Sequence, residues 1–291
     1  MSESVRMRGR ELDLSRPVLM GIVNATPDSF SDRQGPKQLA ELVEHALGKV
    51  EDGAAIVDVG GESGRTDTEA VPVEEEIARV VPLVERLAAR GVLVSVDTWR
   101  GPVARAALAA GAAMVNDVSG LSDETIASAC GDVGAALVIT HTRVAPKTKA
   151  FPGYDDVVGD VHGFLGERMR AAEALGVAPE QIVLDPGIDL AKTPAESIEV
   201  LRRLPELAAL GRPFLLAVSR KDFVGALTER PPAARDAGTL AAVGAAVRGG
   251  ARIVRVHDVA GARDYLSVRE ALSEGADSML ELASELKREA V

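Results

Sequence analysis

Residues 18–24, VLMGIVN, form the first of eight short apolar runs that recur about every 33 residues along this chain of 291 residues. The run is rich in aliphatic residues and does not alternate with polar ones, which is typical of a parallel strand buried on both faces. Amphipathic stretches of helical length separate the runs. The eight runs occupy residues 18–24, 55–61, 92–98, 114–117, 136–141, 182–185, 214–219 and 253–257.

Eight strand–helix units predict the α/β class and, within it, a (β/α)₈ barrel of the TIM type. In such barrels the functional site lies at the carboxyl ends of the strands. Nearly every run ends in a side chain that can do chemistry, so the pattern predicts both the fold and the place of the site. These side chains are Asn24, Asp58, Asp97, Asn116, His141, Asp185, Ser219 and His257.

The composition of the chain argues against several classes of protein. The formal charge of −11 argues against a nucleic-acid surface, because phosphate backbones need a basic face. No apolar run approaches the roughly 20 residues that span a bilayer, and the charged N-terminal segment lacks the apolar region of a secretory signal. The single cysteine, Cys130, cannot form an intramolecular disulfide. We therefore expect a cytoplasmic protein that binds neither nucleic acid nor membrane.

The chain shows no interdomain linker, so we expect one domain over residues 17–291, preceded by an N-terminal extension over residues 1–16. Apolar residues over 271–290 are spaced for an additional C-terminal helix. That helix could pack on a partner subunit, which favours a homodimer.

The strand ends differ in charge around the predicted barrel mouth. Asp97, Asn116 and Asp185 supply oxygen acceptors without a His or Cys cluster, so they suit a ligand with rows of N–H donors, such as an aminopyrimidinone, and not zinc. The last two runs end in basic segments instead, Ser219-Arg220-Lys221 and Arg255-Val256-His257. TIM barrels commonly bind phosphate at the ends of these two strands. Taken singly, each of these residues could equally form a salt bridge or a helix cap.

Two loops add weaker signals. Asn24 and Asp28 offer oxygens suited to Mg²⁺, although a polar turn with Asx caps explains them as well. Gly60 and Gly61 would let backbone N–H groups approach an anion, and Arg65 adds positive charge nearby.

Seven motifs then resemble, in order, the motif series of the dihydropteroate synthase family. They are MGIVNATPDSFSD (20–32), GGES (60–63), SVDT (95–98), ND (116–117), DPG (185–187), SRK (219–221) and RVHDV (255–259). The resemblance implies a (β/α)₈ barrel that joins a dihydropterin pyrophosphate to p-aminobenzoate and releases pyrophosphate, giving dihydropteroate for folate synthesis.

The resemblance also implies roles for single residues. Asn24 would bind Mg²⁺ carried on the pyrophosphate. Asp97, Asn116 and Asp185 would hold the donor edge of the pterin. Lys221 would reach the pterin's acceptors, and Arg255 and His257 would bind pyrophosphate, so that Lys221 and Arg255 stabilise the departing group. Further substrate contacts would come from Ser219 and Phe30, in the p-aminobenzoate pocket, and from Arg65 in the second loop.

The chain departs from the family pattern in three loops, at Gly64, Asp67, Thr140, Thr142, Asp189 and Leu190. The second-loop changes remove a hydroxyl and a proline and add a carboxylate near an anionic substrate. Thr140 and Thr142 replace an apolar wall of the pterin slot, and the change at Asp189-Leu190 removes a ring that would pack on the pterin. Each loss of packing or stacking could cost roughly 1 kcal/mol in binding. The alternative interpretation is therefore a divergent paralogue of the same fold with weak, altered or no synthase activity. A pterin-binding domain like those of corrinoid methyltransferases is disfavoured, because it would not need the phosphate-binding motifs.

Overall fold

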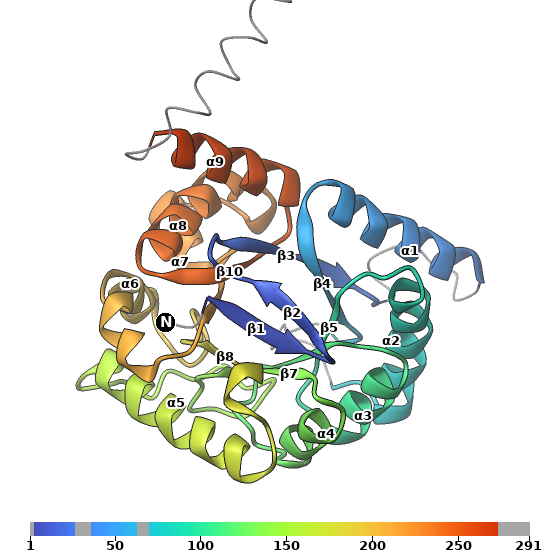
Figure 1. Ribbon diagram of the computed structural model, residues 1–291. Helices are drawn as coiled ribbons and strands as arrows, with labels where there is room; N and C mark the ends of the chain where they lie inside the picture. Colours follow the sequence, from blue (N-terminus) through green and yellow to red (C-terminus); the bar gives the residue numbers. More distant parts are fainter. Residues whose placement is uncertain (1–2, 27–35, 63–69, 273–291) are drawn as a thin grey trace, which may run out of the picture.

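The computed structural model describes residues 3–26, 36–62 and 70–272. Eight parallel strands close into one barrel, and helices surround it (Figure 1). The strands follow each other around the barrel in chain order, with the last, β10, pairing with the first, β3. The predicted (β/α)₈ barrel is therefore confirmed. Its strands are β3 (Val18–Asn24), β4 (Ala54–Gly60), β5 (Val94–Asp97), β6 (Met114–Asp117), β7 (Ala136–Thr140), β8 (Ile182–Asp185), β9 (Phe214–Ala217) and β10 (Ala251–Val256).

The helices lie on the outside, where one side of every strand packs against them. The α-helices are α1 (Pro36–Glu51), α2 (Val73–Ala88), α3 (Gly101–Ala109), α4 (Thr125–Val133), α5 (Val157–Ala174), α6 (Pro194–Arg202), α7 (Asp222–Thr228), α8 (Asp236–Arg248) and α9 (Val259–Ala271). Short 3₁₀ helices are η2 (Pro179–Gln181), η3 (Leu204–Leu210) and η4 (Pro232–Ala234). None of the helices in the described ranges is long and apolar enough to cross a bilayer.

The other side of each strand faces the barrel interior, and its chemistry changes along the strand. Near the amino ends of the strands this face is apolar, with Met20, Ile56, Met114, Val138, Val183, Leu215 and Ile253 in one cluster. Side chains on one face of a strand recur every second residue. The next residues on that face are therefore the polar ones of the mouth, including Asp58, Asn116, Thr140, Asp185 and Arg255.

An N-terminal hairpin closes the amino end of the barrel. Its strands β1 (Ser4–Met7) and β2 (Arg10–Asp13) pair antiparallel and lie across the barrel in Figure 1. Val5, Met7 and Leu14 are fully buried and belong to the interior apolar cluster. Three residues of the N-terminal extension thus share the core of the barrel. The C-terminal helix expected over residues 271–290 lies almost entirely outside the described residues.

We expect Met7→Ala to lower the free energy of unfolding by about 2–5 kcal/mol, because it opens a cavity where the hairpin meets the barrel interior. Urea denaturation followed by circular dichroism measures the change. Glu11→Ala, on the exposed side of the same hairpin, is the matched control and should shift stability by less than about 0.5 kcal/mol. Equal stability of both variants would mean that the hairpin is not part of the cooperative core.

Candidate active site

Arg255 lies at the centre of the barrel mouth and joins two carboxylates from neighbouring strands. Its Nε donates to Asp58 Oδ2 at 2.6 Å and its Nη2 donates to Asp97 Oδ2 at 2.7 Å. Asn116 Nδ2 also donates to Asp58 Oδ2, at 3.2 Å. These four side chains come from β10, β4, β5 and β6, so the barrel closure brings together residues up to 197 positions apart.

Asp58 is fully buried and organises this cluster. The sequence placed it at the end of a strand, but the motifs gave it no role. A fully buried carboxylate needs a charged or hydrogen-bonding partner, and Arg255 and Asn116 supply both. Its position two residues after the interior Ile56, on the same face of β4, was the signal for a role inside the mouth.

Burial changes the protonation of the acidic groups in the mouth. It raises the pKa of Asp97 to about 7, helped by the nearby negative charges of Asp58 and Glu76 and opposed by Arg255 and Lys221. Burial also raises the pKa of Asp185, opposed by the N–H of Gly187 and by the charges of Lys221, Lys192 and Arg255. The mouth therefore holds carboxyl groups that gain stabilisation from any ligand presenting N–H donors or positive charge.

Several buried polar atoms in the mouth have no hydrogen-bond partner among the described residues. They are Asp58 Oδ1, Ser95 Oγ, Asn116 Oδ1 and Thr140 Oγ1, from the four neighbouring strands β4 to β7. Leaving such an atom unpaired costs about 1–3 kcal/mol. Four such atoms on four neighbouring strands leave an arc of unsatisfied polar atoms inside the barrel.

Ser219 and His257 form the opposite side of the mouth. Ser219 Oγ accepts from the backbone N–H of His257 at 3.2 Å and lies 2.9 Å from its Nδ1. Burial lowers the pKa of His257 to about 4, reinforced by the positive charges of Arg220, Arg255 and Lys49. The ring is therefore neutral at physiological pH. When the Ser219 hydroxyl donates to Nδ1, the remaining ring N–H at Nε2 is available to an anion.

The two residues between Ser219 and helix α7 have different positions. Arg220 has a left-handed backbone with φ of 59° and pairs with Asp236 at 2.9 Å, so its charge is used within the fold. Lys221 caps α7, and its positive charge acts on both Asp97 and Asp185. The positive charge of Lys221 thus acts on carboxylates from two different strands of the mouth.

Asn24 ends β3 with an exposed side chain next to Gly60. No group of three or more His, Cys, Asp or Glu side chains that could hold a metal occurs in residues 3–26, 36–62 and 70–272. A metal at Asn24 would therefore take most of its ligands from water and a bound phosphate, which is how Mg²⁺ usually binds.

The first two loops are seen only at their bases. Phe30, Gly64, Arg65 and Asp67 lie outside the described residues. At the base of the second loop, Glu62 is buried and pairs with Arg100 at 2.8 Å and with Lys147, from the loop after β7, at 3.3 Å.

The same base is tied to helix α2 by a buried glutamate. Arg100 also pairs with Glu76 on α2, which accepts from Thr98 Oγ1 at 2.8 Å. This buried ion-pair network fixes where the second loop leaves the barrel. The sequence motifs did not indicate it, because its members lie in four separate segments.

The remaining departures from the family motif have structural partners, with one exception. Thr142 exchanges hydrogen bonds with the backbone of Val144 in a turn. Asp189 has a φ of 63° and accepts from Ser197 Oγ at 3.1 Å and from the backbone N–H groups of Asp222 and Phe223 at the start of α7. Thr140 is the exception, since its buried hydroxyl is unpartnered among the described residues.

A family model described as "Pterin binding enzyme" matches residues 20–257. The chain is 44% identical over 281 residues to a dihydropteroate synthase of Neisseria meningitidis serogroup C, covering 94% of this chain and 99% of that one. It is 40% identical over 266 residues to the dihydropteroate synthase of Escherichia coli, covering 91% and 94%.

Solved structures agree with these relatives. The Xanthomonas albilineans dihydropteroate synthase with 4-aminobenzoic acid superimposes with a TM-score of 0.87 at 44% identity, covering 94% of this chain and 98% of that one. The Burkholderia cenocepacia dihydropteroate synthase complexed with 7,8-dihydropteroate gives a TM-score of 0.85 at 39% identity, covering 92% and 96%.

The raised pKa of Asp97 gives a pH test of the acidic cluster. A carboxyl whose pKa rises from an ordinary value near 3.8 to about 7 binds its proton more tightly when folded, so its ionisation destabilises the fold as pH rises from about 4 to 7. Asp97→Asn cannot ionise, so its stability relative to the wild type should increase over this range. Denaturation at several pH values measures the difference. If the curves of Asp97→Asn and the wild type stay parallel over this range, the shift is contradicted.

Proposed function

The chain belongs to the dihydropteroate synthase family of pterin-binding enzymes, and from this premise we infer that its barrel mouth joins a dihydropterin pyrophosphate to p-aminobenzoate. The C–O bond to pyrophosphate breaks, the C–N bond to the arylamine forms, and the amine loses one proton. One observation supports the assignment of the site above all. Buried polar oxygens that have no hydrogen-bond partner among the described residues lie on strands β4 to β7, and the basic residues Lys221 and Arg255 lie on the other side of the same mouth.

The acidic side suits the pterin. An aminopyrimidinone ring presents a row of N–H donors, which carboxylate and amide oxygens accept in one plane. Asn116 Oδ1 and the carboxylates of Asp97 and Asp185 are the acceptors we assign to this edge. The same carboxylates stabilise the positive charge that grows on the pterin as the C–O bond breaks, and they act strongly because they are preorganised and buried.

The basic side suits the departing pyrophosphate. Lys221 and Arg255 offer full positive charges, and the guanidinium of Arg255 keeps donors beyond the two that bind Asp58 and Asp97. Neutral His257, oriented by Ser219, contributes an N–H donor. We propose that these three residues bind pyrophosphate, with Lys221 and Arg255 stabilising its charge as it leaves. Arg255 also holds the carboxylates of the pterin side, so it couples recognition of the two halves of the substrate.

Mg²⁺ fits the donor set at Asn24, a single exposed amide oxygen at the end of β3. When bound together with pyrophosphate, it would neutralise part of the leaving group's charge. Asn24 would hold it from the β3 side while Lys221 and Arg255 contact the phosphates from β9 and β10.

We assign p-aminobenzoate to the Ser219 side of the mouth, with Phe30 and Arg65, which lie outside the described residues, as further contacts. The ion-pair network at Glu62 and Arg100 supports a role for the second loop because it fixes the base of that loop beside the mouth.

We also propose a cytoplasmic homodimer. Cys130 is free and buried, which agrees with a reducing compartment. Val268 and Leu272, four residues apart at the end of α9, are 60% and 83% exposed and form an apolar strip suited to a partner subunit.

Release of pyrophosphate, measured by a coupled assay with and without p-aminobenzoate, tests the reaction. We expect release that depends on p-aminobenzoate and is accompanied by dihydropteroate. Asp185→Asn should weaken binding of 6-hydroxymethylpterin in calorimetry by about 1–3 kcal/mol, because an acceptor is replaced by a mispaired donor. Growth of a synthase-deficient strain separates the alternatives: a well-folded protein that neither complements nor releases pyrophosphate would be the divergent paralogue.

Thr140 offers a test of the pterin wall at a position where the chain departs from its family. Thr140→Val keeps the shape but removes the hydroxyl, so we expect pterin affinity to fall by about 1 kcal/mol, or roughly fivefold. Thr140→Ser keeps the hydroxyl and should retain most of the affinity. Thr142→Val, whose hydroxyl serves only a local turn, is the matched control. If Thr140→Val binds as tightly as the wild type, the hydroxyl does not face the ligand.

A further inference from the structure

The loop after β8 begins directly after Asp185, the last residue of the strand, and is held in an unusual backbone conformation. Within five residues, Gly187, Asp189 and Ala191 all adopt left-handed backbones, with φ of 71°, 63° and 53°. A non-glycine residue in this region costs of order 1 kcal/mol or more, so such a loop persists only when contacts around it are strong. Asp189 provides contacts on the side of α7, and Lys192 provides them on the inside of the loop.

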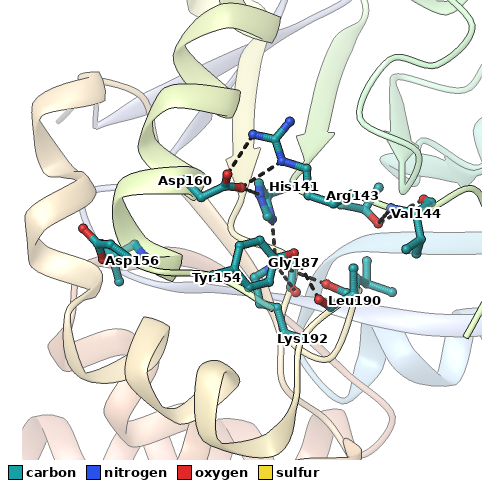
Figure 2. Close-up of polar contacts among 12 residues, drawn as sticks. His141, Arg143, Val144, Tyr154, Asp156, Asp160, Gly187, Leu190 and Lys192 are labelled. Carbon is teal, nitrogen blue, oxygen red and sulfur yellow. Dashed lines mark hydrogen bonds and ion pairs between the residues drawn. The ribbon is translucent and has the colours of Figure 1, made fainter. Parts of the chain in front are cut away.

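Lys192 is the largest side chain among the fully buried ones, with 1% of its surface exposed. Its Nζ lies 2.7 Å from His141 Nδ1, 3.0 Å from the carbonyl oxygen of Gly187 and 3.2 Å from that of Leu190 (Figure 2). An ammonium group has three donors, and these are three acceptors. The buried charge is therefore fully hydrogen-bonded within its own loop and to β7.

His141 has a defined protonation state in this arrangement. Because Lys192 donates to Nδ1, the ring proton lies on Nε2, which donates to Asp160 Oδ1 at 2.8 Å. Burial and the charge of Lys192 lower the pKa of His141 to about 3, so the ring stays neutral. Arg143 holds Asp160 through two hydrogen bonds of 2.9 Å (Figure 2). The chain Arg143–Asp160–His141 thus anchors Lys192 to helix α5.

One residue, Gly187, links Lys192 to Asp185 through its backbone. The N–H of Gly187 donates to Asp185 Oδ1 at 2.7 Å, and its carbonyl oxygen accepts from Lys192. A Cβ at Gly187 would collide with the carbonyl oxygen of His141, so glycine is required for this close approach. The backbone N–H of His141 in turn donates to the carbonyl of Asp185 at 2.8 Å. Any shift of Lys192 is therefore passed directly to the carboxylate.

We propose that Lys192 is a positioning residue for pterin binding. It orients Asp185 through the backbone of Gly187, and the positive charge of Lys192 keeps Asp185 a charged acceptor. The inference rests on the proposed function, since it concerns the same pterin site. Lys192 itself is buried beneath the loop and contacts no substrate. It acts on the pterin half of the reaction only.

The first test is calorimetric binding of 6-hydroxymethylpterin to Lys192→Met, which keeps the length and removes the charge. We expect affinity to fall tenfold or more, while the KM for p-aminobenzoate stays within about twofold. Lys149→Met, which removes an exposed lysine in the loop after β7, is the matched control and should bind normally.

The pH dependence distinguishes positioning from simple damage to the fold. The charges that act on Asp185 are those of Lys192, Lys221 and Arg255. The charges that act on Lys192 are those of Asp185, Asp160, Glu196 and Lys221. Burial lowers the pKa of Lys192 to about 7, so its charge is lost as pH rises. Removing that charge also raises the pKa of Asp185. Because of both effects, the ratio of wild-type to Lys192→Met affinity for 6-hydroxymethylpterin should be largest at low pH and smaller above about pH 7. If this affinity ratio does not change with pH, the proposal is overturned.

Variants of His141 provide a second route that does not depend on Lys192→Met folding. In His141→Asn, the side-chain amide places an acceptor near the position of Nδ1, which faces Lys192. In His141→Gln, the amide reaches the position of Nε2, which faces Asp160. We expect His141→Asn to retain pterin affinity within a few-fold and His141→Gln to lose it about as Lys192→Met does. Equal affinities of the two variants would contradict the proposal. If the wild type itself binds no pterin, the proposed function fails; if it binds and the variants match it, only the role of Lys192 fails.

Discussion

The strict alternation of side chains along eight closed strands is the constraint on which this molecule depends. One face of each strand packs on the helices, and the other must fill the barrel interior. Because the interior is apolar at Ile56 and Val183 and polar two residues later at Asp58 and Asp185, every strand contributes both to the core and to the mouth. A shift of one residue in β4, β8 or β10 would turn Asp58, Asp185 or Arg255 toward the helices.

The mouth gains its chemistry at a cost in stability. Asp58 and Asp97 are held close together beside a single guanidinium, and burial opposes the ionisation of Asp97. Replacing such clusters by apolar groups is often neutral or stabilising in proteins, so their presence is explained by binding and not by folding. The N-terminal hairpin offsets part of this cost by completing the apolar core at the other end of the barrel.

The departures from the family motif follow a common physical pattern. Asp tolerates the left-handed backbone of position 189 better than most residues, and the Asp189 carboxylate binds the start of α7 beside Lys221. The loop that follows Asp185 is therefore tied to the segment that carries Lys221. Buried Lys192 holds the same loop from beneath. Together these contacts fix the positions of Asp185 and Lys221.

The sequence by itself determined the fold and most of the site. Apolar runs without alternation predict buried parallel strands, and the residues ending them predict the acidic and basic sides of the mouth, because in a barrel all carboxyl ends meet at one face. These signals are local, so Asp97, Asn116, Asp185 and Lys221 could be found from their own neighbours along the chain.

Only the tertiary structure decided which of these groups pair. The bond from Arg255 to Asp58 joins residues 197 positions apart, and that from Lys192 to His141 joins residues 51 apart. No local pattern encodes such pairs, since they arise from barrel closure and loop geometry. The same holds for protonation: neutral His257 and the shifted Asp97 follow from burial and neighbouring charges, which depend on how the chain packs and not on residue type.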